Sequence, residues 1–76
     1  MSARFPVITP QQLIKALRRI GFEIDHQRGS HVVLRHLLDH RMVVIPMHGR
    51  DIPKGTLKGM LKDIGLDTDE LLSILK

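Results

Sequence analysis

The sequence predicts an α+β fold with the element order α-β-β-β-α-α. Three observations predict it: an apolar stripe with helical spacing near the N-terminus, three strand-like runs between residues 22 and 46, and two helical segments after Pro53. A three-stranded antiparallel sheet with helices on one face is the economical arrangement for 76 residues. It leaves the other sheet face to water or to a partner. We expect residues 1–76 to form a single domain.

The first helix is expected to begin after Thr9. Thr9 suits the N-cap, Pro10 the first helical position, and Gln12 completes a T-x-x-Q capping box. The apolar stripe that follows consists of Leu13, Ile14, Leu17 and Ile20. The basic residues off this stripe, expected on the solvent side, are Lys15, Arg18 and Arg19. Gly21 is expected to stop the helix.

Three strands are expected next. Phe22, Ile24 and His26 alternate with polar residues, which predicts a half-buried strand with these three side chains on one face. A tight turn at Arg28-Gly29 should lead into a second strand at residues 30–36. The third run, residues 41–46, ends at Pro46. Because proline cannot donate to a ladder, this strand should stop there or lie at an edge.

Two helices complete the chain. Pro53 should open the second helix, and Gly65 should end it. Asp67 or Thr68 should cap the last helix. The side chains expected to face inward are Leu57, Met60, Leu61 and Ile64 of the second helix and Leu71, Leu72 and Leu75 of the last. The predicted architecture resembles the double-stranded-RNA-binding fold.

The charge is unevenly placed along the chain. Residues 1–62 contain eleven of the twelve Lys and Arg residues but only four of the eight acids, so this part is more basic than the net charge of +4 suggests. A polyanion is the natural partner of such a surface, although a solvated cationic face is the plain alternative. Phe5 and Phe22 are the only aromatic residues besides histidine, which argues against a domain that binds single strands by stacking.

The composition also limits the expected cellular location and the kinds of metal or disulfide site. There is no cysteine, hence no disulfide and no thiolate zinc site. No apolar run approaches the roughly 20 residues of a membrane span, and the first ten residues lack the apolar stretch of a secretory signal. We therefore expect a soluble, cytoplasmic protein without membrane attachment.

His31 is the histidine whose neighbours favour chemistry. Strand alternation places His31 and Arg35 on one face and Val32 and Leu34 on the other. If the helices cover Val32 and Leu34, the imidazole shares the open face with guanidinium groups and can meet a phosphodiester. For His26, His36 and His40 an ordinary polar role near a hairpin is the simpler interpretation.

Other chemistries fit less well. Ser30 and His31 are adjacent on a strand, so they point to opposite faces and do not form a nucleophile–base pair. The glycines of "HGRDIPKGTLKG" do not match a phosphate-binding P-loop. Arg50 and Lys54 near a helix start are able to hold a phosphate, or they belong to an ordinary loop. No third metal ligand accompanies His36 and His40, and we expect neither a metal nor another cofactor.

The stretches "RGSHVVLRH" and "VVIPMHGRDIPKGTLKGMLKDIGL" resemble those of HicA-type mRNA interferase toxins. The shared elements are Gly29-Ser30-His31, Pro46-Met47-His48 and Lys54-Gly55-Thr56-Leu57, in order and at suitable spacing. The resemblance extends from about Pro10 to Leu66. One departure is Leu34, where many relatives have an aromatic residue.

This resemblance implies a double-stranded-RNA-binding-like fold, ribonuclease activity on messenger RNA and a cognate HicB-type antitoxin. It assigns the catalytic histidine to His31 and a supporting role to His48. The residues expected to bind RNA are Lys15, Arg18, Arg19, Arg28, Gly29, Ser30, Arg35, Arg50, Lys54 and Lys58. An acidic or RNA-mimicking antitoxin would cover Lys15, Arg18, Arg19 and His31.

A metal-independent mechanism suits these residues as a hypothesis. The ribose 2′-hydroxyl is an internal nucleophile, His31 would accept its proton, and His48 would protonate the leaving 5′ oxygen. Arg28, Arg35 or Lys54 would stabilise the charge on the phosphate. Sequence selectivity should be weak because phosphate contacts do not read bases. The rival hypotheses are a non-catalytic RNA-binding module and a small domain that docks an acidic protein.

Overall fold

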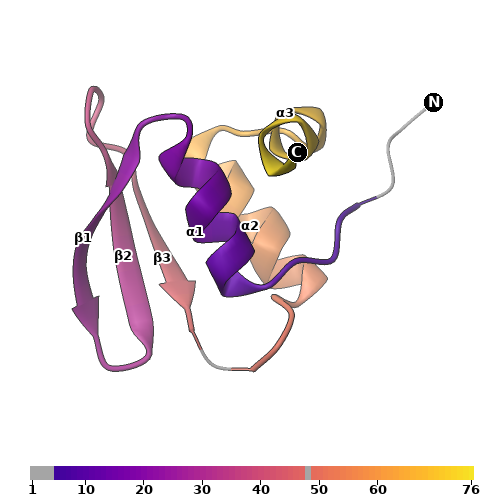
Figure 1. Cartoon of the computed structure of the whole chain (residues 1–76), viewed down its shortest axis with the longest axis horizontal. Coiled ribbons are helices and arrows are strands. Elements are labelled where there is room, and N and C mark those ends of the chain that lie inside the picture. The colour runs from indigo at the N-terminus through magenta and orange to yellow at the C-terminus, as the bar shows by residue number, and fades with distance from the viewer. Residues whose placement is uncertain (1–4, 48) are drawn as a thin grey trace.

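The computed structural model describes residues 5–47 and 49–76 and shows a three-stranded sheet with all helices on one of its faces (Figure 1). The elements are α1 (Pro10–Arg18), β1 (Phe22–Arg28), β2 (His31–His36), β3 (Met42–Pro46), α2 (Lys54–Ile64) and α3 (Thr68–Leu75). The sheet is antiparallel in the order β1-β2-β3, so β2 is central. The predicted fold class and element order are confirmed. We call the face packed against the helices the inner face and the opposite one the outer face.

The start of α1 follows the predicted local signals. The Thr9 hydroxyl accepts a hydrogen bond from the Gln12 backbone N–H at 3.2 Å, and the Gln12 side chain accepts one from the Thr9 N–H at 2.8 Å. Two N–H groups that the helix cannot pair itself are thereby satisfied. Leu13 and Leu17 are fully buried, whereas Ile14 and Ile20 are half-buried. The helix ends at Arg18, with Arg19 as its C-cap, so it stops three residues before Gly21 and earlier than predicted. Gly21 has φ +103°, a conformation that favours glycine.

β1 departs from the predicted alternation. Ile24 pairs with Leu34 but His26 pairs with Val33, so Asp25 is an extra residue on β1, a β-bulge. The bulge reverses the alternation, and His26 lies on the outer face instead of sharing the inner face with Phe22. Ile24 keeps the inner side but is 50% exposed, because the end of β1 extends past the helices. The prediction of a half-buried strand is therefore wrong beyond Phe22.

The hairpin and the edge strand are close to expectation. The turn between β1 and β2 consists of Gly29 and Ser30, one residue later than predicted, and Arg28 pairs with His31. Val32 and Leu34 are buried on the inner face, whereas His31 and Arg35 are exposed. β3 is an edge strand that ends at Pro46, as the missing N–H of proline requires.

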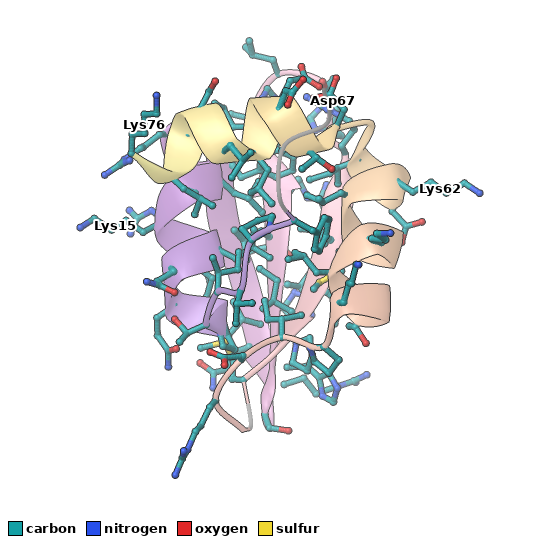
Figure 2. All side chains as sticks on the ribbon, turned by 90° about the vertical axis from the view of Figure 1, so that its right-hand side faces the viewer. Lys15, Lys62, Asp67 and Lys76 are labelled. Atoms are coloured by element: carbon teal, nitrogen blue, oxygen red, sulfur yellow. The ribbon has the colours of Figure 1, made fainter. Side chains whose placement is uncertain are left out.

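The two C-terminal helices begin and end at the predicted signals. α2 begins directly after Pro53 and ends at Gly65, which has φ +70°. Asp67 caps α3 through a reciprocal pair of hydrogen bonds with Glu70, at 2.8 and 2.9 Å. In Figure 2, α3 crosses the C-terminal ends of α1 and α2. Its Leu71 is fully buried, so α3 closes one end of the core.

The core lies between the inner face and the helices (Figure 2). Its fully buried large side chains are Phe22, Leu13, Leu17, Leu34, Ile45, Leu57, Ile64 and Leu71. The segment 5–9 joins this layer, because the Ile52 N–H donates to the Ile8 carbonyl at 2.8 Å. Among the helices of the described ranges, none is long and apolar enough to span a bilayer. Every helix of residues 5–47 and 49–76 lies on the inner face, so no helix or further strand in these ranges covers the outer face.

Candidate functional site

The outer face carries three cross-strand rows, each with one residue from every strand. The rows are Arg28–His31–Pro46, His26–Val33–Val44 and Glu23–Arg35–Met42. The side chains from β1 are polar or charged, those from β2 are His31, Val33 and Arg35, and those from β3 are apolar. Val33 is buried although its side chain points outward. It lies on the central strand, between His26 of β1 and Val44 of β3.

His31 lies where the hairpin turn meets the central strand. It is the first residue of β2, exposed, and directly opposite Arg28 on β1. Directly opposite residues in an antiparallel pair have Cβ atoms about 4.5–5.5 Å apart, so the side chains of Arg28 and His31 leave the sheet next to each other. Gly29, with φ +57°, permits the tight turn that sets this pairing. The arrangement puts a proton-transfer group beside a fixed positive charge on an open surface.

The end of β3 meets the same corner of the sheet. Pro46 pairs with His31, and the Met47 backbone N–H donates to the Ser30 carbonyl at 2.6 Å. The next residue, His48, lies outside the described residues, so its predicted supporting role stays a prediction.

Arg35 shares the outer face with His31 but is not its neighbour. Four residues separate them on one strand, which corresponds to roughly 13 Å. The Arg35 Nε lies 3.4 Å from a carboxylate oxygen of Asp25. Arg28 is therefore the arginine adjacent to His31, and Arg35 belongs to the ion cluster of the bulge.

The basic residues of α1 lie in the helix layer, away from His31. Lys15 and Lys62 project from opposite edges of that layer in Figure 2. Arg18 reaches the Glu23 carboxylate at 3.5 Å, at the end of the sheet far from His31. The Arg19 guanidinium donates to the backbone carbonyl of Ile74, at 2.8 Å, and to that of Lys76. Arg19 thus attaches α3 to α1, which gives it a structural role.

The basic residues of α2 also lie on the helix side. The ammonium groups of Lys54 and Lys58 lie over the Phe5 ring, 5.8 and 5.4 Å from its centroid. Arg50, in the loop before α2, is exposed. The predicted RNA-binding residues are thus spread over the outer face, the helix side and the loops, and a partner that covers Lys15 and His31 together must reach around the edge of the sheet.

His36 is a structural residue at the other end of β2. It is only 7% exposed, and its ring lies edge-on to Phe22 with the centroids 4.9 Å apart. The Leu38 N–H donates to Nδ1 at 3.2 Å, so the ring proton is on Nε2, which donates to the Ile20 carbonyl at 2.8 Å. Both ring nitrogens are therefore used within the fold.

His26 belongs to a polar cluster that periodicity did not predict. Its Nδ1 lies 2.7 Å from Asp25 Oδ2, and its side chain is 52% exposed. The hydrogen bond from His26 and the charge of Arg35 hold the pKa of Asp25 below its usual value. The bulge that creates this cluster has no signature in the sequence, since it is a property of the pairing with β2.

A metal site is not formed by the described residues, because no group of three potential ligands lies close enough together. An open depression of about 540 Å³ lies along α1 and is lined by Lys15, Arg18 and Glu23 among others, at the end of the sheet far from His31.

The sequence model of the HicA toxin family of bacterial toxin–antitoxin systems matches residues 10–66. The chain belongs to this family. The match spans α1 to the end of α2 and includes His31 and Arg28. Membership in the HicA family makes the chain the toxin component of a toxin–antitoxin system and implies a cognate antitoxin as its partner. No match to the chain was found among curated proteins.

Proposed function

We propose that this HicA-family toxin is a metal-independent endoribonuclease that cleaves messenger RNA, with His31 as a general acid/base. The observation that carries the proposal is the position of His31 on the uncovered face, opposite Arg28 and inside the family match. The reaction needs a base, an acid for the leaving group, a cation near the phosphate and a substrate with its own nucleophile.

The proposed reaction is transesterification within the RNA. His31 accepts the proton of the 2′-hydroxyl, whose oxygen bonds to phosphorus while the bond from phosphorus to the 5′ oxygen breaks. The leaving 5′ oxygen takes a proton from a second group, a role for which the sequence offers His48. The products are a 2′,3′-cyclic phosphate and a 5′-hydroxyl, and DNA is not cleaved because it lacks the nucleophile. Arg28 stabilises the charge that develops on the phosphate.

Weak sequence selectivity follows from the side chains on this face. Lys and Arg hold phosphates and do not discriminate bases, and no Trp, Tyr or Phe lies on the outer face among the described residues. Binding should weaken steeply as salt is added, since each neutralised phosphate releases counterions.

A HicB-type antitoxin of acidic or RNA-mimicking character is the proposed partner, and the cytoplasm, where messenger RNA is translated, is the proposed place of action. Such a partner would compete with RNA for the basic residues around His31. Adding it to the cleavage reaction should stop cleavage at one antitoxin per toxin.

The deciding experiment incubates labelled RNA and a DNA of the same sequence with pure protein, with and without EDTA. Cleavage of the RNA alone, insensitive to EDTA and ending in a cyclic phosphate, supports the proposal. His31→Ala should then lose cleavage and keep RNA binding. Intact RNA with bound wild-type protein would identify a non-catalytic RNA-binding module instead, and no binding at physiological salt would favour a domain that docks an acidic protein.

Variants of Arg28 and Arg35 form a matched pair that tests which arginine stabilises the charge on the phosphate. Both are exposed arginines of the outer face, but only Arg28 is directly opposite His31. Arg28→Gln should lower the cleavage rate about tenfold, and Arg35→Gln should lower it less. Equal losses would mean that the two act through general attraction of RNA.

A further inference from the structure

The bulge in β1 places a second histidine beside the proposed site. Without an extra residue at Asp25, His26 would follow Ile24 onto the inner side. With it, His26 pairs with Val33 and points outward. Bulges are frequent next to active sites, where they redirect a side chain or end a pairing. Here the redirected side chain is an imidazole.

His26 and His31 are diagonal neighbours on the outer face. His26 is opposite Val33, and His31 lies two residues before Val33 on the same strand. Diagonal residues of adjacent antiparallel strands are about 7–8 Å apart. Two imidazoles at this separation are able to approach one phosphodiester from two sides, with Arg28 next to both.

The His26 ring is held by Asp25. An ionised carboxylate only accepts hydrogen bonds, so at 2.7 Å the Nδ1–H of His26 donates to Asp25 Oδ2. The lowered pKa of Asp25 keeps this carboxylate charged at neutral pH. Nε2 has no hydrogen-bond partner in residues 5–47 and 49–76, and it is the nitrogen available to a substrate.

The charged groups around His26 come from its own strand, β1, and from the neighbouring strand β2. Asp25 and Arg28 lie on β1, and His31 and Arg35 on β2. Val44 is the residue in the same row on β3. Asp25 accepts a hydrogen bond from His26, whereas Arg28 lies directly opposite His31, so the two rings have different charged neighbours.

We propose that His26 is the general acid of the reaction, donating the proton to the leaving 5′ oxygen, and that Asp25 is its positioning residue. This inference rests on the proposed ribonuclease function and completes it. The 2′ proton goes to His31, the new bond joins the 2′ oxygen to phosphorus, the bond from phosphorus to the 5′ oxygen breaks, and the Nε2 proton of His26 goes to that oxygen. One proton is taken up and one is given, so no cofactor or co-reactant is needed.

The test compares two RNA substrates that differ in the leaving atom. In one, the 5′ oxygen at a single site is replaced by sulfur, which departs as a thiolate and needs no proton. His26→Gln should cleave the ordinary RNA about 10²–10⁴-fold more slowly than wild type. It should cleave the sulfur-containing RNA at a rate close to that of wild type. His31→Ala should cleave both RNAs slowly, because the 2′-hydroxyl must lose its proton with either leaving atom.

Three further variants make the comparison specific. Asp25→Asn keeps a hydrogen-bond acceptor and removes the charge. It should lower the cleavage rate of ordinary RNA about fivefold and leave the cleavage rate of the sulfur-containing RNA unchanged. His40→Asn changes an exposed histidine of the loop between β2 and β3 and should leave both rates unchanged. His48→Gln tests the other candidate for the acid. Circular dichroism and thermal unfolding of each variant confirm that it is folded.

Each outcome decides. The proposal is supported if His26→Gln cleaves ordinary RNA more slowly than wild type but cleaves the sulfur-containing RNA at close to the wild-type rate. An unchanged rate on ordinary RNA, or equal slowing on both substrates, would overturn it and leave the function of His31 intact. If the sulfur-containing RNA restores the cleavage rate of His48→Gln and not that of His26→Gln, the general acid is His48. If wild-type protein cleaves neither RNA, the proposed function itself fails.

Discussion

β2 begins and ends with a histidine, and the two rings have opposite surroundings. His31 is exposed on the outer face next to Arg28, and His36 is buried on the inner face against Phe22. Five residues separate them, so strand alternation alone sends them to opposite faces. The buried ring has both nitrogens bonded to backbone, at Ile20 and Leu38, and stabilises the fold. The comparison teaches that the same residue type, on one strand, is part of the core at one end and exposed on the outer face at the other.

Removing the exposed ring tests this division most strongly. His31→Ala should lower the RNA cleavage rate by about 10²–10⁴-fold, the usual contribution of a general base. The free energy of unfolding should change by less than about 0.5 kcal/mol, because the side chain lies at the surface. Cleavage assays and urea unfolding of the same preparation measure both. A destabilised His31→Ala protein would contradict the division.

Removing the buried ring should have the opposite result. His36→Ala leaves a cavity beside Phe22 and deprives the Ile20 carbonyl of its donor, so it should cost about 2–4 kcal/mol of unfolding free energy. His36→Phe fills the space without supplying the donor and should recover only part of the loss. Urea unfolding measures both variants. Cleavage by the folded fraction should match wild type, and a specific loss of cleavage would show that His36 also serves the site.

The approach of Gly21 to His36 gives a third, smaller effect. A Cβ at Gly21 would lie 2.8 Å from His36 Nε2, and φ there is +103°. Gly21→Ala should therefore cost about 1–3 kcal/mol. Gly65→Ala is the matched control, since its φ is +70° but open space surrounds it, and it should cost about 1 kcal/mol. Equal losses at the two positions in thermal unfolding would mean that the contact with His36 contributes nothing.

The smallest effect concerns pH at the His36 end of the sheet. Hydrogen bonds from the side chain and the backbone N–H of Arg41, at 2.8 and 3.0 Å, lower the pKa of Asp39 below its ordinary 3.8. A carboxyl with a lowered pKa in the folded state contributes stability above its unfolded value and loses it as pH falls through the folded value. Asp39→Asn should be slightly less stable than wild type at neutral pH.

That difference should shrink as the pH falls below the ordinary 3.8 and vanish once Asp39 is protonated in the folded state as well. Thermal unfolding of both proteins across this range measures it. A difference that grows on acidification would contradict the assignment. The His31 end has no part in this effect, so cleavage at neutral pH should be unchanged by Asp39→Asn.

The sequence by itself determined the element order, the helix ends and the outward direction of His31. These features depend on neighbours within four residues: Thr9 with Gln12, Gly65 at a left-handed φ, and the alternation of Val32 and Leu34 with His31. Interactions between residues that are close in sequence do not depend on the tertiary fold, so they can be predicted from the sequence.

The tertiary structure decided what depends on distant partners. The bulge at Asp25 exists only because β1 pairs with β2 in one register, and it moves His26 onto the outer face. Arg19 is a structural residue because α3 brings the Ile74 carbonyl to it from 55 positions away. His36 is buried because Gly21 admits its ring beside Phe22. Register and packing are set by the free energy of the whole fold, and no short stretch of sequence specifies them.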